Sequence, residues 1–118
     1  MSEGGFKYHV QVCEAIDMDC NLHTDCTVCQ TFPEGQNPVC CGTTRAQTIA
    51  KADGNYIFTY KDGEGGRTSK VVIGCGDNDG WSVKNAEGSL DYTIKGNLPE
   101  ACRYSARCDA RARRFCDD

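Results

Sequence analysis

The chain has 118 residues, of which 39% are hydrophobic, and this length fits one domain with a core of its own. Ten cysteines in a chain of this size are typical of a disulfide scaffold and argue against a protein of the reducing cytosol. The formal net charge of −4 argues against nucleic-acid binding, and no stretch approaches the roughly 18 apolar residues of a membrane span.

The cysteines also indicate the compartment. We expect the secretory pathway, in the lumen of the ER, the Golgi or the lysosome, or the extracellular space. The first residues, Met1 to Gly5, contain no apolar signal region. We therefore expect that a secretory signal was removed or that the chain is a segment of a longer protein.

The first predicted element is a strand over residues 6–13. Apolar side chains recur at every second position, and this period of two is typical of a half-buried strand. The residues on the apolar face are Phe6, Tyr8, Val10 and Val12.

Residues 14–46 are polar and predict loop and short strand fastened by bridges. The spacing Cys26-Thr27-Val28-Cys29 also fits half of a zinc site or a redox pair, but it lacks a matching second pair and a surrounding βαβ pattern. Disulfides are the favoured interpretation, and no metal site is predicted. We expect this group to pair mostly within itself: Cys20, Cys26, Cys29, Cys40 and Cys41.

A hairpin and a further strand follow. Residues 48–50 and 56–60 flank Asp53-Gly54-Asn55, which suits the positive φ angles of a hairpin turn. Residues 61–66 predict another turn, and residues 67–75 the strand after it. Arg67 has the parity of Val71 and Ile73, so its guanidinium is expected to point toward the interior side, where it needs partners.

The last part of the chain predicts a turn, a strand and a tail. Residues 76–80 are rich in carboxylates but lack the length and terminal Glu of a calcium loop. Residues 90–98 alternate and predict a final strand, with Tyr92 on its apolar face. Residues 100–116 predict a short helical tail that contains Cys102, Cys108 and Cys116.

These elements predict an all-β fold, a sandwich or a barrel. No nucleophile triad, phosphate loop or metal-ligand set stands out among the residues. We therefore expect that the chain is not an enzyme and needs no cofactor.

Several segments, in this order, resemble the mannose 6-phosphate receptor homology domain, most of all the repeats of the cation-independent receptor. The resemblance covers about residues 6–102, which gives a lectin-like domain over 1–102 and a Cys/Arg-rich extension over 103–118. It implies a flattened β-barrel of two antiparallel sheets. The segments are residues 8–13, 27–30, 60–63, 67–75, 87–92 and 99–102.

The resemblance also implies a mannose site of four side chains. Gln30 directly follows the Val-Cys element, Arg67 precedes Cys75 by eight residues, Glu87 precedes Tyr92 by five, and Tyr92 precedes Cys102 by ten. An arginine and an amide can bind the axial 2-hydroxyl of mannose, while a carboxylate accepts from neighbouring hydroxyls. Each residue taken singly also fits an ordinary structural role.

The chain departs from phosphate-binding relatives in one respect. The loop before Arg67 is short and has no cysteine, and Leu90 stands where a relative has the paired cysteine. Asp62 and Glu64 in that loop would repel a phosphate dianion. Plain high-mannose glycans therefore stand beside phosphomannosyl glycans as the expected partners.

The resemblance implies a bridge between Cys75 and Cys102. In relatives Cys13 pairs with a cysteine upstream, which is missing here. The partner of Cys13 must therefore come from residues 20–41 or from the tail. We expect Cys108 or Cys116, because a free terminal helix of this length is marginal in water.

The sequence thus predicts a lectin that recognises mannose-terminated glycans, with or without a 6-phosphate, for glycoprotein recognition or sorting. Neighbouring domains of a larger receptor are possible partners. Two alternatives stay open, namely a protein- or peptide-binding module on the same fold and a small secreted cysteine-rich effector.

Overall fold

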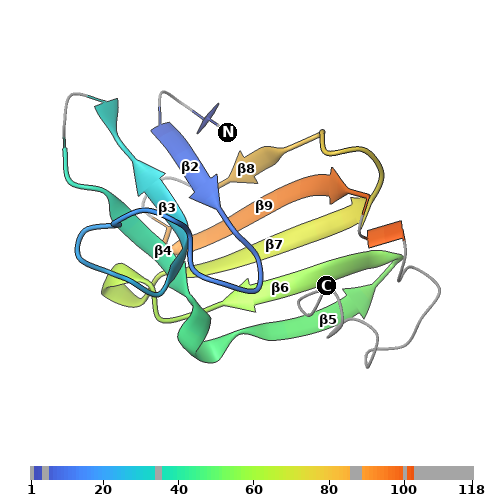
Figure 1. Ribbon diagram of the computed structural model, residues 1–118, viewed down its shortest axis with the longest axis horizontal. Coiled ribbons are helices and arrows are strands. Elements are labelled where there is room, and N and C mark those ends of the chain that lie inside the picture. Colours follow the sequence, from blue (N-terminus) through green and yellow to red (C-terminus); the bar gives the residue numbers. More distant parts are fainter. Residues whose placement is uncertain (1, 4–5, 34–35, 86–88, 100, 103–118) are drawn as a thin grey trace.

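Two β-sheets pack face to face in the computed structural model, which describes residues 2–3, 6–33, 36–85, 89–99 and 101–102 (Figure 1). The first sheet is antiparallel and contains β1 (Ser2–Glu3), β2 (Phe6–Val10), β3 (Cys26–Thr31) and β4 (Val39–Thr43), side by side in that order.

The second sheet has the order β5-β6-β7-β9-β8. Its strands are β5 (Thr48–Ala52), β6 (Asn55–Tyr60), β7 (Thr68–Cys75), β8 (Ser82–Lys84) and β9 (Asp91–Leu98). Two short 3-10 turns, η2 (Thr44–Ala46) and η3 (Glu64–Gly66), lie in the connections. The prediction of an all-β, disulfide-rich fold of two sheets is confirmed.

One pairing in the second sheet departs from the antiparallel arrangement. The chain leaves β7, forms β8 at the sheet edge and returns as β9 between the two. Because β9 is antiparallel to β8, it lies parallel to β7, with Ser69 opposite Tyr92. The β5–β6 hairpin turns at Asp53 and Gly54, with φ angles of 54° and 80°, as expected for a two-residue turn of this kind.

The main core lies between the sheets and is built by alternation along the strands. On β6, for example, Tyr56, Phe58 and Tyr60 are fully buried, while the residues between them are partly exposed. The two sheets contribute the core together: Tyr8, Val28, Cys41, Tyr56, Phe58, Tyr60, Val71, Ile73, Val83, Tyr92, Ile94 and Ala101.

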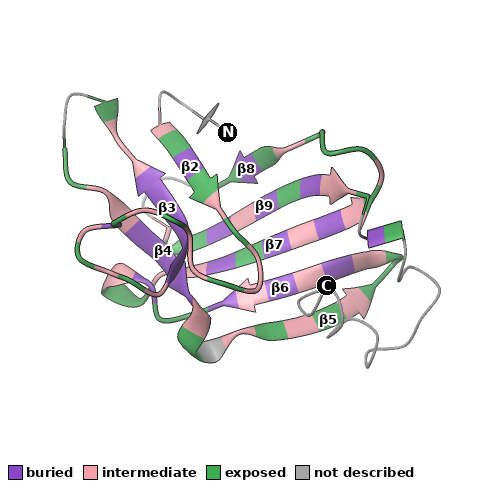
Figure 2. Cartoon of the chain, viewed as in Figure 1, coloured by how far each residue is buried: buried purple, intermediate pink, exposed green. Residues whose placement is uncertain are grey.

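A second, smaller core covers the outer face of the first sheet. As Figure 2 shows, β3 is buried along most of its length, which a strand with one solvated face would not be. The reason is a group that we call the outer cluster, made of the disulfides Cys20–Cys29 and Cys26–Cys40 with Ile16 and Met18 packed against them.

The outer cluster also bears on the zinc alternative. The sulfur atoms of Cys20, Cys26 and Cys40 lie within 4.8 Å of one another. All three are held in disulfides, whereas a zinc ligand must be a thiolate. Their closeness therefore follows from two adjacent bridges.

One sequence-based boundary needs correction. The strand expected over residues 6–13 ends at Val10, because the chain turns away at Cys13, which has a φ of 77° and whose N–H donates to the Tyr60 hydroxyl at 2.8 Å. The short helix expected over residues 100–116 lies, apart from Ala101 and Cys102, outside the described residues.

Candidate functional site

Three of the four residues of the predicted mannose site meet at one end of the sandwich. The Arg67 Nε–H donates to the Tyr92 hydroxyl at 3.2 Å, and the Tyr92 hydroxyl donates to Gln30 Oε1 at 3.2 Å. Gln30 belongs to β3 of the first sheet, whereas Tyr92 lies on β9 of the second and Arg67 just before β7. The hydrogen bonds therefore join the two sheets through side chains that are chemically suited to bind hydroxyl groups.

Arg67 lies on the same side of the strand as the buried Ser69, Val71 and Ile73, as its parity predicts. Its guanidinium is partly exposed and bends back over the loop before β7, where Nη1 donates to the Glu64 carbonyl at 2.8 Å. Gly65 permits this position, because a Cβ atom there would lie 3.0 Å from Nη1. Gly63 lets the same loop approach the backbone of Cys41, which a Cβ atom would meet at 2.6 Å.

Cys41 is a fourth member of this group, and the sequence analysis did not assign it to the site. It is the one cysteine that is free among the described residues, and it is fully buried. Its thiol donates to the Val39 carbonyl at 3.7 Å and lies near the Tyr92 hydroxyl, the Gln30 backbone and Arg67. We call Gln30, Cys41, Arg67 and Tyr92 the polar cluster.

Burial governs the protonation of the polar cluster. Burial raises the pKa of the Cys41 thiol from 9.0 to about 11, although its hydrogen bonds and the nearby Arg67 charge act in the opposite direction. Burial also raises the pKa of Tyr92. Both groups are therefore neutral at physiological pH, and Arg67 carries the charge of the cluster.

Neighbouring residues from both sheets hold the polar cluster in place. The ring of Tyr8, which is opposite Gln30 in the β2–β3 register, packs edge to face against Tyr92 at a centroid distance of 6.2 Å. The buried Ser69 hydroxyl donates to the Cys41 carbonyl at 2.9 Å and so ties β7 to β4. This end of the sandwich is thus fixed before any ligand arrives.

Donors of the polar cluster remain without a protein partner within the described part of the chain. There, Gln30 Nε2 and Arg67 Nη2 make no hydrogen bond, and Arg67 forms no ion pair. An amide and a charged guanidinium in this state are suited to bind the oxygen atoms of a ligand.

The fourth predicted sugar-binding residue and the predicted disulfides remain to be placed. Glu87 lies outside the described residues. The structure joins Cys75 to Cys102, the pairing that the resemblance implies, and it joins the cysteines of the 20–41 segment as Cys20–Cys29 and Cys26–Cys40. Cys13 also forms a disulfide, but the prediction that its partner is Cys108 or Cys116 falls outside the described residues.

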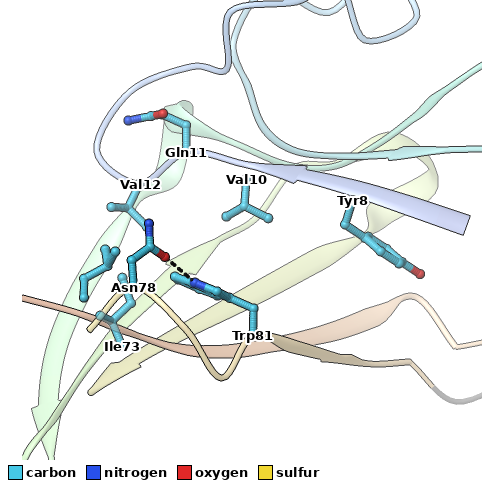
Figure 3. Close-up of a pocket in the computed structure, with 8 residues that line it drawn as sticks. Tyr8, Val10, Gln11, Val12, Ile73, Asn78 and Trp81 are labelled. Atoms are coloured by element: carbon cyan, nitrogen blue, oxygen red, sulfur yellow. Dashed lines mark hydrogen bonds between the residues drawn. The ribbon is translucent and has the colours of Figure 1, made fainter. Parts of the chain in front are cut away.

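A cavity of about 550 Å³ lies between the sheets, apart from the polar cluster (Figure 3). Figure 3 shows Trp81 and Asn78, joined by a hydrogen bond of 2.6 Å, opposite side chains from β2 and the segment after it. Its walls carry no ionisable group other than a tyrosine: Tyr8, Val10, Gln11, Val12, Ile73, Asn78, Trp81 and Leu98. The sequence analysis did not anticipate this cavity, because its lining comes from segments far apart in the chain.

Two signals in the sequence could have revealed the missed residues of the site. Tyr8 stands on the apolar face of an alternating strand, which predicts an inward side chain. Cys40 and Cys41 are consecutive, so on a strand only one of them can face the core. Asn21 and His23, which contact Glu64, carry no such signal because they lie in an irregular loop.

No protein-family model matches the chain, and no curated protein matches its sequence. Among the described residues, no helix is long and apolar enough to cross a membrane.

Proposed function

We propose that the chain is a non-enzymatic lectin of the mannose 6-phosphate receptor homology type that binds mannose-terminated glycans at the polar cluster. Gln30, Arg67 and Tyr92 act as the hydroxyl-binding residues, with Glu87 as the fourth. The observation that carries the proposal is the hydrogen-bonded series from Arg67 through Tyr92 to Gln30. These residues lie far apart in the sequence, yet their side chains meet in the fold, and the resemblance had grouped them as one site.

The chemistry of the cluster supports a sugar over an ionic ligand. A sugar hydroxyl both donates and accepts, which suits an amide, a tyrosine hydroxyl and a guanidinium in one place. The buried Cys41 thiol is neutral and gives the interior side of the site a weakly polar surface. The contact with the axial 2-hydroxyl would distinguish mannose from glucose.

The loop beside Arg67 favours glycans that lack phosphate. The exposed Asp62 and the partly exposed Glu64 add negative charge to the loop that precedes Arg67. A phosphate dianion bound to Arg67 would meet these carboxylates, which weakens its attraction to the cluster. We therefore propose high-mannose glycans as the main ligands, with phosphomannosyl glycans as the weaker class.

A glycan array followed by calorimetry with methyl α-mannoside tests the proposal. We expect mannose-dependent binding that galactose does not reproduce. Gln30→Ala and Arg67→Ala should each abolish it, because losing a hydrogen-bonding group in a site that recognises hydroxyls weakens binding by about 2–3 kcal/mol. Gln11→Ala and Lys70→Ala change exposed residues outside the cluster and should bind like the parent.

Absence of mannose binding in the parent protein would overturn the proposal. It would favour the alternative of a protein-binding module on the same fold. Leu22 and Leu90, the large apolar residues that are exposed among those described, would then be the first residues to test for a protein contact.

A further inference from the structure

Glu64 is held by a turn of the outer cluster, and its carbonyl in turn holds the arginine of the proposed sugar site. The Asn21 amide Nδ2 donates to Glu64 Oε1 at 2.8 Å, and His23 Nε2 lies 3.2 Å from the same oxygen. The Glu64 carbonyl accepts from Arg67 Nη1 at 2.8 Å and from the Arg67 backbone N–H at 3.2 Å. One residue therefore links the turn to the guanidinium.

The turn that carries Asn21 and His23 is rigid for two reasons. Its backbone closes on itself, because the His23 N–H donates to the Cys20 carbonyl at 3.0 Å. The Cys20–Cys29 disulfide fastens it to β3, and Cys29 directly precedes Gln30. The turn that contacts Glu64 is thus tied covalently to the strand that supplies the amide of the proposed site.

The conformation of this turn is strained. Asn21 and Leu22 have φ angles of 51° and 70°, and a left-handed conformation is unfavourable for leucine. Leu22 does not compensate by packing, because it is 88% exposed. Strain that persists without a packing gain points to a role for the contacts that the turn makes. Besides the Cys20–Cys29 disulfide to β3, the side chains of this turn contact Glu64 within the described residues.

The receiving loop depends on this support. Within the described residues, the η3 loop buries no side chain of its own, and Gly65 and Gly66 have positive φ angles of 63° and 84°. A short loop with two glycines loses much conformational entropy when it becomes ordered. Side-chain contacts to Glu64 offset part of this cost.

We propose that Asn21 and Glu64 are positioning residues that hold Arg67 in the geometry required for sugar binding. The proposal rests on the mannose-binding function proposed above. Asn21 donates to the Glu64 carboxylate, the ordered loop presents the Glu64 carbonyl to Nη1, and Nε is left directed at the Tyr92 hydroxyl. Neither residue needs to touch the sugar.

Affinity for methyl α-mannoside, measured by calorimetry on the full chain, is the first test. Glu64→Ala and Asn21→Ala should each weaken binding about five- to tenfold, the effect of losing one hydrogen bond to a charged group. The double variant should bind no more weakly than Glu64→Ala alone, because Glu64→Ala already removes the contact with Asn21. Glu64→Gln keeps an oxygen that accepts from Asn21 and should restore binding to within about twofold of the parent.

Matched controls separate positioning from general damage. Glu14→Ala and Asn37→Ala change exposed residues of the same types and should bind like the parent. Parent-like affinity in Glu64→Ala, with Arg67→Ala inactive, would overturn the positioning role while leaving the proposed function intact. Equal losses in Glu64→Gln and Glu64→Ala would also overturn it.

A second readout does not need the sugar. The Arg67 Nε–H should give a slowly exchanging NMR signal in the free protein, and Glu64→Ala should make it exchange faster, whereas Glu14→Ala should not. If the parent fails to bind mannose, the proposed function fails, and this signal still decides the positioning role. An unchanged signal in Glu64→Ala would contradict that role.

Discussion

On β4, the neighbouring residues Cys40 and Cys41 face opposite sides of the first sheet. Cys40 belongs to the outer cluster, where two disulfides fasten a loop onto β3 and β4. Cys41 belongs to the polar cluster, where a free thiol, an amide, a hydroxyl and a guanidinium meet through hydrogen bonds.

If the polar cluster binds sugar as proposed, the two faces divide stability from recognition. A disulfide cannot change partners when a ligand arrives, so the outer cluster contributes mainly to stability. Hydrogen bonds between neutral or partly exposed groups can be exchanged for bonds to a sugar. We infer that the covalent face supports the face that binds, and the predictions below test this comparison.

The largest effect is expected from removing a bridge of the outer cluster. The double variant Cys26→Ala/Cys40→Ala opens a loop of sequence separation 14, and it should lower the free energy of unfolding by about 3 kcal/mol. Urea denaturation measures this loss. Cys41→Ala is the matched control on the inner face and should lose far less, so equal losses in the two variants would contradict the comparison.

Alkaline pH should lower the free energy of unfolding through the buried Cys41 thiol on the inner side of the first sheet. The pKa of Cys41 is 9.0 when unperturbed and about 11 in the folded protein, so the stability from keeping the thiol neutral is complete below pH 9. It is then lost as the pH rises to about 11, since the unfolded chain releases this proton first, and the expected loss is about 2–3 kcal/mol. Burial likewise raises the pKa of Tyr60 to about 12, which extends the loss to higher pH.

Cys41→Ala provides the check on this pH dependence. Denaturation at a series of pH values should give a shallower decline in the variant than in the parent through this range. Identical slopes would show that the Cys41 thiol does not titrate as its burial requires.

The sequence could predict the strands of both sheets and three residues of the polar cluster, but not the pairing of the last strands or the disulfide partners. Alternation in residues 6–10, 56–60 and 90–98 comes from burial on one side, which local sequence records directly. The inward parity of Arg67 and its closeness to Gln30 and Tyr92 could be expected from parity and resemblance together.

Other features depend on tertiary contacts and left no local signal. The parallel β7–β9 pair arises because β8 takes the sheet edge. The Cys20–Cys29 and Cys26–Cys40 bridges leave Cys41 free, and cysteine counting alone cannot choose among the connectivities. Asn21 and His23 contact Glu64 across the fold from a turn that the Cys20–Cys29 disulfide fastens to β3.

Removing the tyrosine hydroxyl should have an intermediate effect. Tyr92→Phe leaves the side-chain oxygen Oε1 of Gln30 and the Arg67 Nε–H without their shared partner. The free energy of unfolding should therefore fall by about 1–2 kcal/mol. Mannose affinity should fall at least about tenfold. Tyr56→Phe, another buried tyrosine on the inner faces, should retain the affinity of the parent, and a matching loss there would point to general core damage.

The smallest effect concerns the strained turn of the outer cluster. Leu22→Gly should raise stability by up to about 1 kcal/mol, since glycine adopts the φ of 70° without strain. Leu22→Ala shortens the same exposed side chain but keeps the strain, so it should give no comparable gain. Thermal unfolding of the two variants compares them, and a larger gain from alanine would show that the exposed side chain, not the backbone, sets the cost.

The central claim is that the polar cluster, and not the cavity beside Trp81, is the sugar site. Titration of the ¹⁵N-labelled chain with methyl α-mannoside, followed by NMR, tests it most directly. The account predicts that the largest shifts occur at the Gln30 side-chain amide and the Arg67 Nε–H, while the Trp81 indole N–H stays in place. Shifts confined to Trp81 and Gln11, or none at millimolar sugar, would contradict it.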